Sequence, residues 1–253
     1  MIRGIEGFKQ WFAGHEGQYV IIGGAACDLL MNDAGLDFRA TKDIDLVLIV
    51  EALDATFGKL IWGYINAAGY EHKTKSSGLP QFYRFTNPKT KDYPAMIELF
   101  SRKPDAIVLP DNAELSPLPM KEDISSLSAI LLDEDYYRFL VQGRVQVDGV
   151  TILDAPYLIP FKAKAWIDLT RRKAAGEPID ERNIRKHKND VFRLSELLNN
   201  HTNVSELLPT SVREDIRFFL NMMRQEKIDL IQLGIRYRNK EDILNELARI
   251  YLS

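Results

Sequence analysis

The first hundred residues alternate between two kinds of apolar pattern. Short continuous apolar runs bounded by glycine or polar residues predict buried strands, whereas apolar residues spaced three or four apart predict helices. Strands are predicted over residues 19–22, 46–50, 82–85 and 95–100, and helices over residues 5–12, 25–31 and 53–68. Gly69 follows the last of these helices as a natural C-cap. This alternation favours an α/β or α+β domain with helices packed against one sheet.

The second half of the chain changes from strands to helices. Residues 102–122 are rich in proline and acidic residues and are expected to form a connector. Short strands are predicted over residues 127–132, 137–141, 145–147 and 150–153, and Asp148-Gly149 predicts a hairpin turn. Helices are predicted over residues 161–172, 181–198, 211–224 and 241–251, with breaks at 176–178 and 199–203. We therefore expect two domains, a mixed one over residues 1–155 and a helical one over residues 156–253.

The composition narrows the class of protein. The chain has 253 residues and 45% hydrophobic content, enough for a large packed core, and its net charge of −3 provides no global basic field. Its single cysteine, Cys27, allows neither a disulfide framework nor a thiolate metal site, as is typical of a reducing cytoplasm. No apolar run approaches the roughly 18 residues of a membrane span. We therefore expect a cytoplasmic protein with no membrane partner.

Two aspartates at the start of a predicted strand are the first candidates for chemistry. Asp43 and Asp45 are two residues apart, so in a strand both side chains project from the same face. Two close carboxylates repel each other, and a divalent cation such as Mg²⁺, which prefers oxygen ligands, relieves that repulsion. Upstream, Gly23-Gly24 follows another apolar run and lets a backbone approach a phosphate closely. The alternatives are a solvated strand face and a simple turn.

A third acidic side chain stands in another apolar strand. Glu98 lies in the otherwise apolar segment AMIELF. It is either a third metal-binding carboxylate delivered from a neighbouring strand or an edge-strand charge that faces water.

The glycine pair, the segment RATKDIDL at residues 39–46 and the later acidic strand together resemble the nucleotidyltransferase superfamily, the fold of DNA polymerase β. The fuller string is similar to the AbiEii-type nucleotidyltransferases, the toxin halves of bacterial toxin–antitoxin and abortive-infection systems. Residues 160–166 and 186–191 look like the lysine-bearing helix and the later basic-then-aspartate helix of that family. The chain departs from the usual pattern in having Gly-Gly for Gly-Ser and Asn189-Asp190 for an Arg-Asp or Lys-Asp pair.

The resemblance implies a fold, a reaction and a site. The fold is a mixed sheet with flanking helices, followed by a C-terminal helical domain. The reaction is Mg²⁺- or Mn²⁺-dependent transfer of a nucleoside monophosphate from a nucleoside triphosphate (NTP) to an acceptor. The implied catalytic residues are Asp43, Asp45, Glu98, Lys162 and Asp190, the first three being the metal ligands. The implied nucleotide-binding residues are Gly23, Gly24, Arg39, Thr41 and Lys162.

The resemblance also implies RNA, with tRNA first, as the acceptor, and a cognate antitoxin as a protein partner. Two alternatives stay open. One is a non-catalytic module on the same fold that binds a nucleotide or a partner protein. The other is a transferase with a small-molecule acceptor.

Several basic residues in the helical half can be assigned to faces. Lys162 shares the buried stripe of its predicted helix, where it either meets a triphosphate or lays its aliphatic stem over the core, whereas Lys164 phases with a polar face. Another cluster comprises Arg182, Arg185, Lys186 and Lys188. This cluster is either a solvated helix face or a phosphate-binding patch for RNA, and Asp190 lies one turn from Lys186, at the spacing of an ordinary ion pair.

Overall fold

The strands of the sheet form at short runs of aliphatic and aromatic residues. The computed structural model describes residues 2–49, 51–71, 82–100 and 133–253. Within these residues a six-stranded mixed sheet has the order β3-β4-β2-β1-β6-β5. The strands are β1 (Tyr19–Ile22), β2 (Asp43–Leu48), β3 (Phe82–Thr86), β4 (Met96–Phe100), β5 (Arg144–Val147) and β6 (Val150–Leu153). The pairs β2–β4 and β1–β6 are parallel, and the other neighbours are antiparallel.

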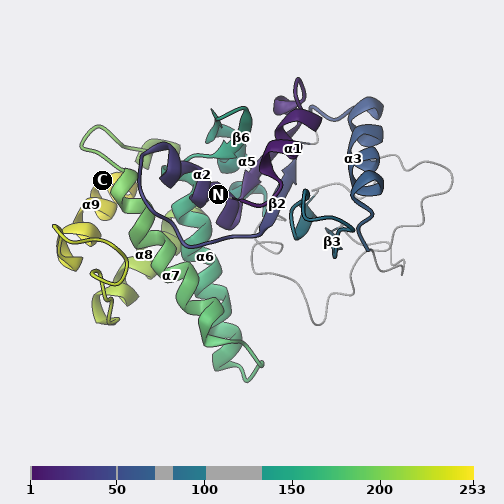
Figure 1. Cartoon of the computed structure of the whole chain (residues 1–253). Helices are drawn as coiled ribbons and strands as arrows, with labels where there is room; N and C mark the ends of the chain where they lie inside the picture. The colour runs from purple at the N-terminus through teal and green to yellow at the C-terminus, as the bar shows by residue number, and fades with distance from the viewer. Residues whose placement is uncertain (1, 50, 72–81, 101–132) are drawn as a thin grey trace.

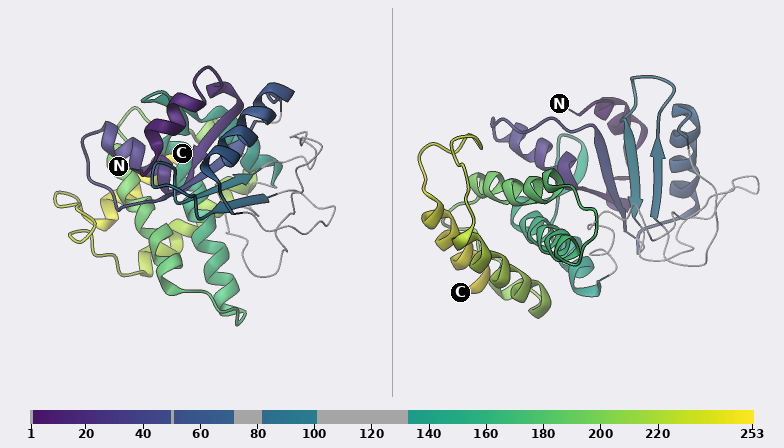
Figure 2. Two further views of the ribbon diagram at one scale, coloured as in Figure 1. Left: turned by 45° about the vertical axis from the view of Figure 1, so that its right-hand side comes forward. Right: turned by 90° about the horizontal axis from the view of Figure 1, so that it is seen from below.

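The helices flank this sheet and make up most of the second half. In the first half they are α1 (Ile5–Trp11), α2 (Gly23–Asp33), α3 (Ala55–Ala68) and α5 (Glu134–Gln142). In the second half they are α6 (Ala155–Ala174), α7 (Glu181–Leu194), α8 (Thr210–Gln225) and α9 (Lys240–Leu252). Helix α3 lies at one end of the molecule and α8 and α9 at the other (Figures 1 and 2). None of the helices in the described ranges is long and apolar enough to cross a membrane.

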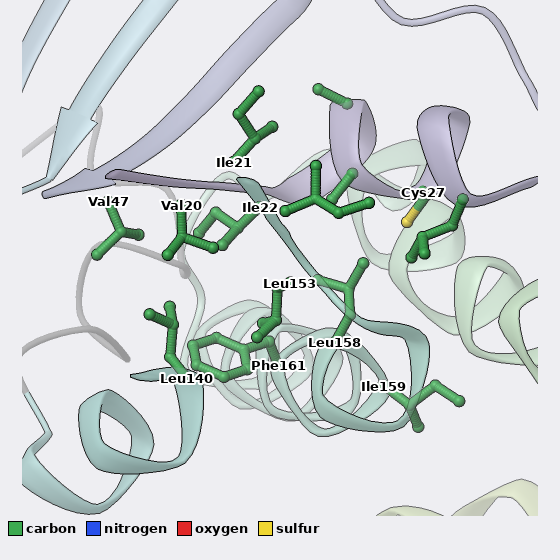
Figure 3. Packing of buried hydrophobic residues seen from close by; sticks show 14 of the residues in the cluster. Val20, Ile21, Ile22, Cys27, Val47, Leu140, Leu153, Leu158, Ile159 and Phe161 are labelled. Atoms are coloured by element: carbon green, nitrogen blue, oxygen red, sulfur yellow. The ribbon is translucent and has the colours of Figure 1, made fainter. Parts of the chain in front are cut away.

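The two faces of β1 pack against different layers. Tyr19 joins an aromatic cluster with Phe8, Phe12 and Phe57 from the helices on one face. Val20 and Ile22 instead point toward the face on which helix α6 lies (Figure 3). Residues of α6 are buried there as part of one continuous hydrophobic cluster that includes both halves of the chain. The sheet and the C-terminal helices are therefore held together by a shared core.

Most predicted elements are present, several with shifted ends. Helix α6 begins at Ala155 and not at residue 161, because Asp154 caps it and Pro156 suits its first turn. Strand β2 begins at Asp43, so both aspartates lie within the strand. The hairpin between β5 and β6 turns at Asp148-Gly149, both with positive φ, as predicted. The predicted connector at 102–122 and the predicted strand at 127–132 lie outside the described residues.

The predicted strand over residues 137–141 is wrong, because these residues belong to helix α5. Asp133 caps the helix by accepting hydrogen bonds from the backbone N–H groups of Asp135 and Tyr136. Tyr136 and Leu140 are four residues apart and both buried, a helical spacing that the apolar run concealed. The cap and this spacing outweigh the β propensity of the aromatic residues.

Candidate active site

On the face of β2 that points toward α6, the residues are acidic at the start of the strand and apolar at its end. Asp45 and Val47 are register partners of Ile22 and Val20, whose side chains point to the α6 face (Figure 3). Because alternate residues share a face, Asp43 projects from this face as well. The pairing of β2 with β4 places Glu98 directly beside Asp45. Two neighbouring parallel strands thus deliver three carboxylates to one face of one sheet.

The glycine pair lets the Asp45 carboxylate approach the start of helix α2. Gly23 has φ +69°, and a Cβ added there would lie 1.8 Å from Asp45 Oδ2. Only glycine fits this combination of positive φ and close approach. The residue before the helix, Ile22, provides no side-chain cap within the described residues. The first N–H groups of α2 therefore remain available to an anion.

Gly24 admits two further side chains to the same helix terminus. A Cβ at Gly24 would lie 3.0 Å from Thr41 Oγ1 and 3.4 Å from an Arg39 guanidinium nitrogen. A hydroxyl and a guanidinium therefore flank the first turn of α2. The structure brings together the glycine pair, Arg39 and Thr41, which the resemblance implied as nucleotide-binding residues.

Glu98 makes an ion pair with a residue that the sequence analysis did not consider. Arg84 of β3 is its register partner, and the Arg84 Nε donates to Glu98 Oε1 at 2.7 Å. On its other side Glu98 is close enough to Asp45 to share a hydrogen bond with it. Burial, followed by the negative charge of Glu98, raises the pKa of Asp45 to about 7. The same two causes raise the pKa of Asp43.

The three carboxylates suit a hard divalent cation in chemistry but are not arranged around one in advance. Their oxygens are the ligands that Mg²⁺ and Mn²⁺ prefer, and burial beside the negative charge of Glu98, which raises the pKa of Asp45, makes a nearby cation favourable. Among the residues whose positions are described, no group of three His, Cys, Asp or Glu side chains forms a ready metal site. Arg84 contacts Oε1 of Glu98, so a cation at this carboxylate would share it with the guanidinium.

A buried ion-pair network stands behind this acidic face. Asp190 of α7 is fully buried and accepts two hydrogen bonds from Arg39, at 3.1 and 2.8 Å. The Lys162 ammonium, 1% exposed, donates to Asp190 at 3.1 Å. Burial alone would raise the pKa of Asp190, but the charges of Lys162 and Arg39 outweigh it and lower the pKa to about 2. Asp190 is therefore an anion that ties α6 and α7 to the segment before β2.

This network corrects one ion-pair prediction and gives Lys162 a partner within the protein. Lys162 lies on the buried stripe, as predicted, but its anionic partner within the protein is Asp190. Asp190 pairs with Arg39 and Lys162, not with Lys186 one turn before it. Lys164 is bound to Asp215 at 2.9 Å on a different side of α6.

A pocket of about 220 Å³ opens over the carboxylates. Its lining consists of Gly24, Arg39, Thr41, Asp43, Asp45, Arg84, Met96, Glu98, Lys162, Lys186 and His187. We call it the carboxylate pocket. Its volume is below the roughly 300–1,000 Å³ of most ligand pockets, a size that suits phosphates and ions.

Lys186 is the carboxylate pocket's exposed lysine. It makes no ion pair with any residue in the described ranges, unlike Lys162. Partial burial, followed by the positive charges of Lys162 and Arg39, lowers the pKa of Lys186. Its neighbour His187 is buried, and burial and nearby lysines hold its pKa well below the usual range, so its imidazole is neutral. A lysine at the pocket wall that makes no direct ion pair with a described residue is suited to bind an anionic ligand.

The residues of the predicted basic cluster on α7 therefore lie in different surroundings. Lys186 belongs to the carboxylate pocket, and Lys188 is bound to Glu226 at 2.6 Å. Arg182 and Arg185 are exposed, and neither makes an ion pair in the part of the chain that is described.

Sequence reasoning missed Arg84 and assigned Lys186 to a different surface. A signal for Arg84 existed, since it is a lone cation in an apolar strand, just as Glu98 is a lone acid in the next. No comparable signal placed Lys186, because its position depends on how α7 packs against the sheet.

Comparisons with known proteins give distant structural neighbours only. No protein-family model matches the chain, and no curated protein sequence matches it. One solved structure, an antigenic nucleotidyltransferase-like protein from Paracoccidioides brasiliensis, superposes with a TM-score of 0.39 and 14% identity, over 88% of this chain and 87% of that one. The antibiotic-resistance factor ANT(2'')-Ia superposes with a TM-score of 0.35 and 12% identity, over 83% of this chain and 89% of that one.

Proposed function

We propose that this chain is a metal-dependent nucleotidyltransferase that moves a nucleoside monophosphate from an NTP to an acceptor hydroxyl. The observation that carries the proposal is that the carboxylate pocket contains both cation-binding and anion-binding groups. Asp43, Asp45 and Glu98 meet there with the open N-terminus of α2 and with Lys186. Oxygen ligands for a cation beside two anion-binding groups match the needs of a metal-bound polyphosphate.

The resemblance suggests a role for each carboxylate. We assign Asp43 and Asp45 to hold the cations, with Glu98 as the ligand on the side of the acceptor. Bound Mg²⁺ or Mn²⁺ would neutralise the negative charge that develops on the entering and leaving oxygens of an in-line displacement. The acceptor oxygen bonds to the α-phosphorus, pyrophosphate leaves, and the proton of the acceptor hydroxyl passes to a base or to water.

The groups around the helix terminus would hold the triphosphate. The N–H groups at the start of α2, with the Thr41 hydroxyl beside them, can donate to phosphate oxygens. Lys186 supplies a positive charge that makes no direct ion pair with any described residue. In this assignment Lys162 and Asp190 position Arg39 at the helix terminus, and Lys186 takes the direct phosphate contact that the sequence suggested for Lys162.

The acceptor that we propose is RNA, with tRNA as the first to test. This part of the proposal rests on the resemblance to AbiEii-type nucleotidyltransferases. The direct experiment incubates the protein with each labelled NTP, Mg²⁺ or Mn²⁺ and total RNA. We expect label to enter RNA with the wild type and not with Asp45→Asn. Label in a small molecule would replace the RNA acceptor by a small one, and no transfer with any NTP would refute the enzymatic proposal.

The ion pair between Arg84 and Glu98 favours a second candidate, a module that binds a nucleotide without transferring it. Because an arginine already neutralises Glu98, the pocket is stable without a third metal ligand. NTP binding that persists in chelator, together with no transfer, would support this candidate. Binding that requires Mg²⁺ or Mn²⁺ would support the transferase.

The same resemblance leads us to propose that the activity is toxic and is controlled by a cognate antitoxin protein. Induced expression of the wild type in a bacterial host should arrest growth, whereas Asp45→Asn should not. Growth arrest by both the wild type and Asp45→Asn would show that toxicity does not depend on the carboxylate pocket.

A further inference from the structure

A second pocket lies on the other side of Arg39. Its volume is about 450 Å³, within the range of roughly 300–1,000 Å³ that small-molecule sites occupy. Three segments far apart in the sequence enclose it: residues 34–39 after α2, the C-terminal end of α7, and residues 232–236 between α8 and α9. Figures 1 and 2 show the chain after α2 reaching toward the C-terminal helices before it returns to β2. We call this cavity the arginine pocket.

Two of its arginines have no hydrogen-bond partner among the described residues. The Arg193 side chain is 16% exposed, yet its guanidinium makes no hydrogen bond within the described residues, and its one ion pair, to Asp190, is long at 3.6 Å. Burial is the largest cause that lowers the pKa of Arg193. Arg236 is exposed and makes neither an ion pair nor a hydrogen bond to any described residue. A half-enclosed guanidinium fork with no acceptor among the described residues can donate to a ligand that enters the pocket.

The remaining lining adds a flat apolar surface to these donors. The Phe38 ring lies 5.1 Å from the Arg39 guanidinium carbon and 5.8 Å from that of Arg193. Leu36, Leu233 and Ile235 line the same cavity. Two acidic residues, Glu196 and Asp37, also line the cavity. Glu196 is bound to Arg238 at 3.2 Å, and Asp37 is exposed to solvent.

The segment beside the pocket carries exposed apolar side chains. Tyr237 directly follows the lining residue Arg236 and is 98% exposed, and Ile231 directly precedes the lining residue Gln232 and is 77% exposed. An aromatic ring that is almost fully exposed, on the residue after a pocket-lining arginine, is free to stack on a nucleobase.

We propose that the arginine pocket is a second ligand site, distinct from the carboxylate pocket, that binds the phosphate group of a nucleotide unit. Arg193 and Arg236 donate to the phosphate oxygens, because planar guanidinium forks match them. The apolar wall and Tyr237 contact the base. The unit is either a free nucleotide or one nucleotide of an RNA chain. The site does not depend on the proposed transfer reaction.

The test is calorimetric titration of the full chain in chelator with adenosine 5′-monophosphate (AMP), adenosine and a short oligoribonucleotide. We expect AMP to bind and adenosine not to bind. Arg236→Gln and Arg193→Gln should each weaken AMP binding by at least about tenfold, as expected for a lost charge-assisted hydrogen bond. Arg217→Gln is the matched control, since Arg217 is exposed on α8 and makes no ion pair within the described residues. It should change the affinity by less than about twofold.

Lys186→Gln separates the two pockets. It should leave AMP binding intact if the arginine pocket is the site, and loss of AMP binding in this variant would overturn the proposal. Equal binding of AMP and adenosine, or unchanged binding in Arg236→Gln, would overturn it as well. Because Arg236 is exposed and makes no ion pair or hydrogen bond with any described residue, the test holds even if Arg193→Gln is unstable. Tighter binding of the oligoribonucleotide through the same arginines would identify the ligand as part of RNA, and equal binding would identify a free nucleotide.

Discussion

Gly23 is the residue on which the carboxylate pocket's geometry depends most directly. Gly23→Ala would force a positive φ on alanine and would place a Cβ 1.8 Å from Asp45 Oδ2. The backbone strain alone costs about 1–3 kcal/mol, and the overlap adds a similar amount unless Asp45 moves away. We therefore expect a loss of both stability and NTP binding, measured by urea denaturation and by calorimetry.

Gly14 provides the matched control for that substitution. It has φ +82°, and a Cβ there would meet no described atom within 4 Å. Gly14→Ala should therefore pay only for the backbone strain and keep NTP binding. Equal losses of stability in the two variants would show that the approach of Asp45 to Gly23 is unimportant.

Asp45 gives the second prediction at this scale. Its pKa is about 7 in the folded chain and near 3.8 in the unfolded one, so the folded state binds the proton more tightly. The free energy of unfolding should therefore fall as pH rises from about 4 to about 7 and stay low above that. One pKa unit corresponds to about 1.4 kcal/mol, so the effect amounts to a few kcal/mol.

Asp45→Asn removes this titration. In chelator at pH 8 we expect the variant to unfold at the same or a higher temperature than the wild type, and at pH 4 we expect the difference to shrink. The same variant should lack transfer activity. A large fall in melting temperature at pH 8 would show instead that Asp45 is needed for folding.

At the scale of elements, one buried aspartate joins α7 to α6 and to the segment before β2. Asp190→Asn would leave Lys162 and Arg39 without their buried partner. Breaking a buried ion pair by removing one member costs about 3–5 kcal/mol. We expect a loss of this size at pH 7, measured by denaturant unfolding.

The pH dependence of the wild type provides an independent check on Asp190. Its pKa is about 2 in the folded chain and near 3.8 in the unfolded one, so its contribution is complete above about pH 4 and is lost as pH falls toward 2. Asp190→Asn should flatten this acid limb. Lys164→Met is the matched control, because Lys164 makes a more exposed ion pair and its loss should cost about 1 kcal/mol or less.

The elements of the sheet could be predicted because each depends on a local pattern. The i, i+2 spacing put both aspartates on one face, and the helical stripe correctly buried Lys162. Helix α5 could not be predicted from its apolar run, because its cap and its tertiary contacts decide between helix and strand. The contact of Arg39 with Asp190 spans 151 positions, and no local pattern contains it. The sequence therefore predicts which residues carry chemistry better than it predicts their partners.

At the scale of the whole molecule, the shared core determines which basic residues meet the site. Helix α6 packs on the face of the sheet that carries the carboxylates, and α7 packs on α6, so α7 presents different residues to different surroundings (Figure 1). Lys186 faces the carboxylate pocket, Lys188 meets Glu226 of the segment after α8, and Arg182 and Arg185 face solvent. From the sequence these residues form one basic cluster, because the local pattern does not reveal how α7 packs.

This division sharpens what we expect for an RNA acceptor. Arg182 lies one helical turn from Lys186, so RNA phosphates beside the carboxylate pocket can reach Arg182 and Arg185. Phosphate contacts release counterions, and the logarithm of affinity falls with the logarithm of salt by about 0.7 per contact for a single strand and about 0.9 for a duplex. Changing Arg182 and Arg185 together to Gln should therefore lower the slope by about 1.4–1.8 and leave NTP affinity unchanged.

Lys188→Gln is the control on the same helix, because Glu226 already neutralises Lys188. A slope that the double variant and the control change equally would mean that the charge of α7 acts only at a distance. Acceptor binding that does not depend on salt would point to a small-molecule acceptor.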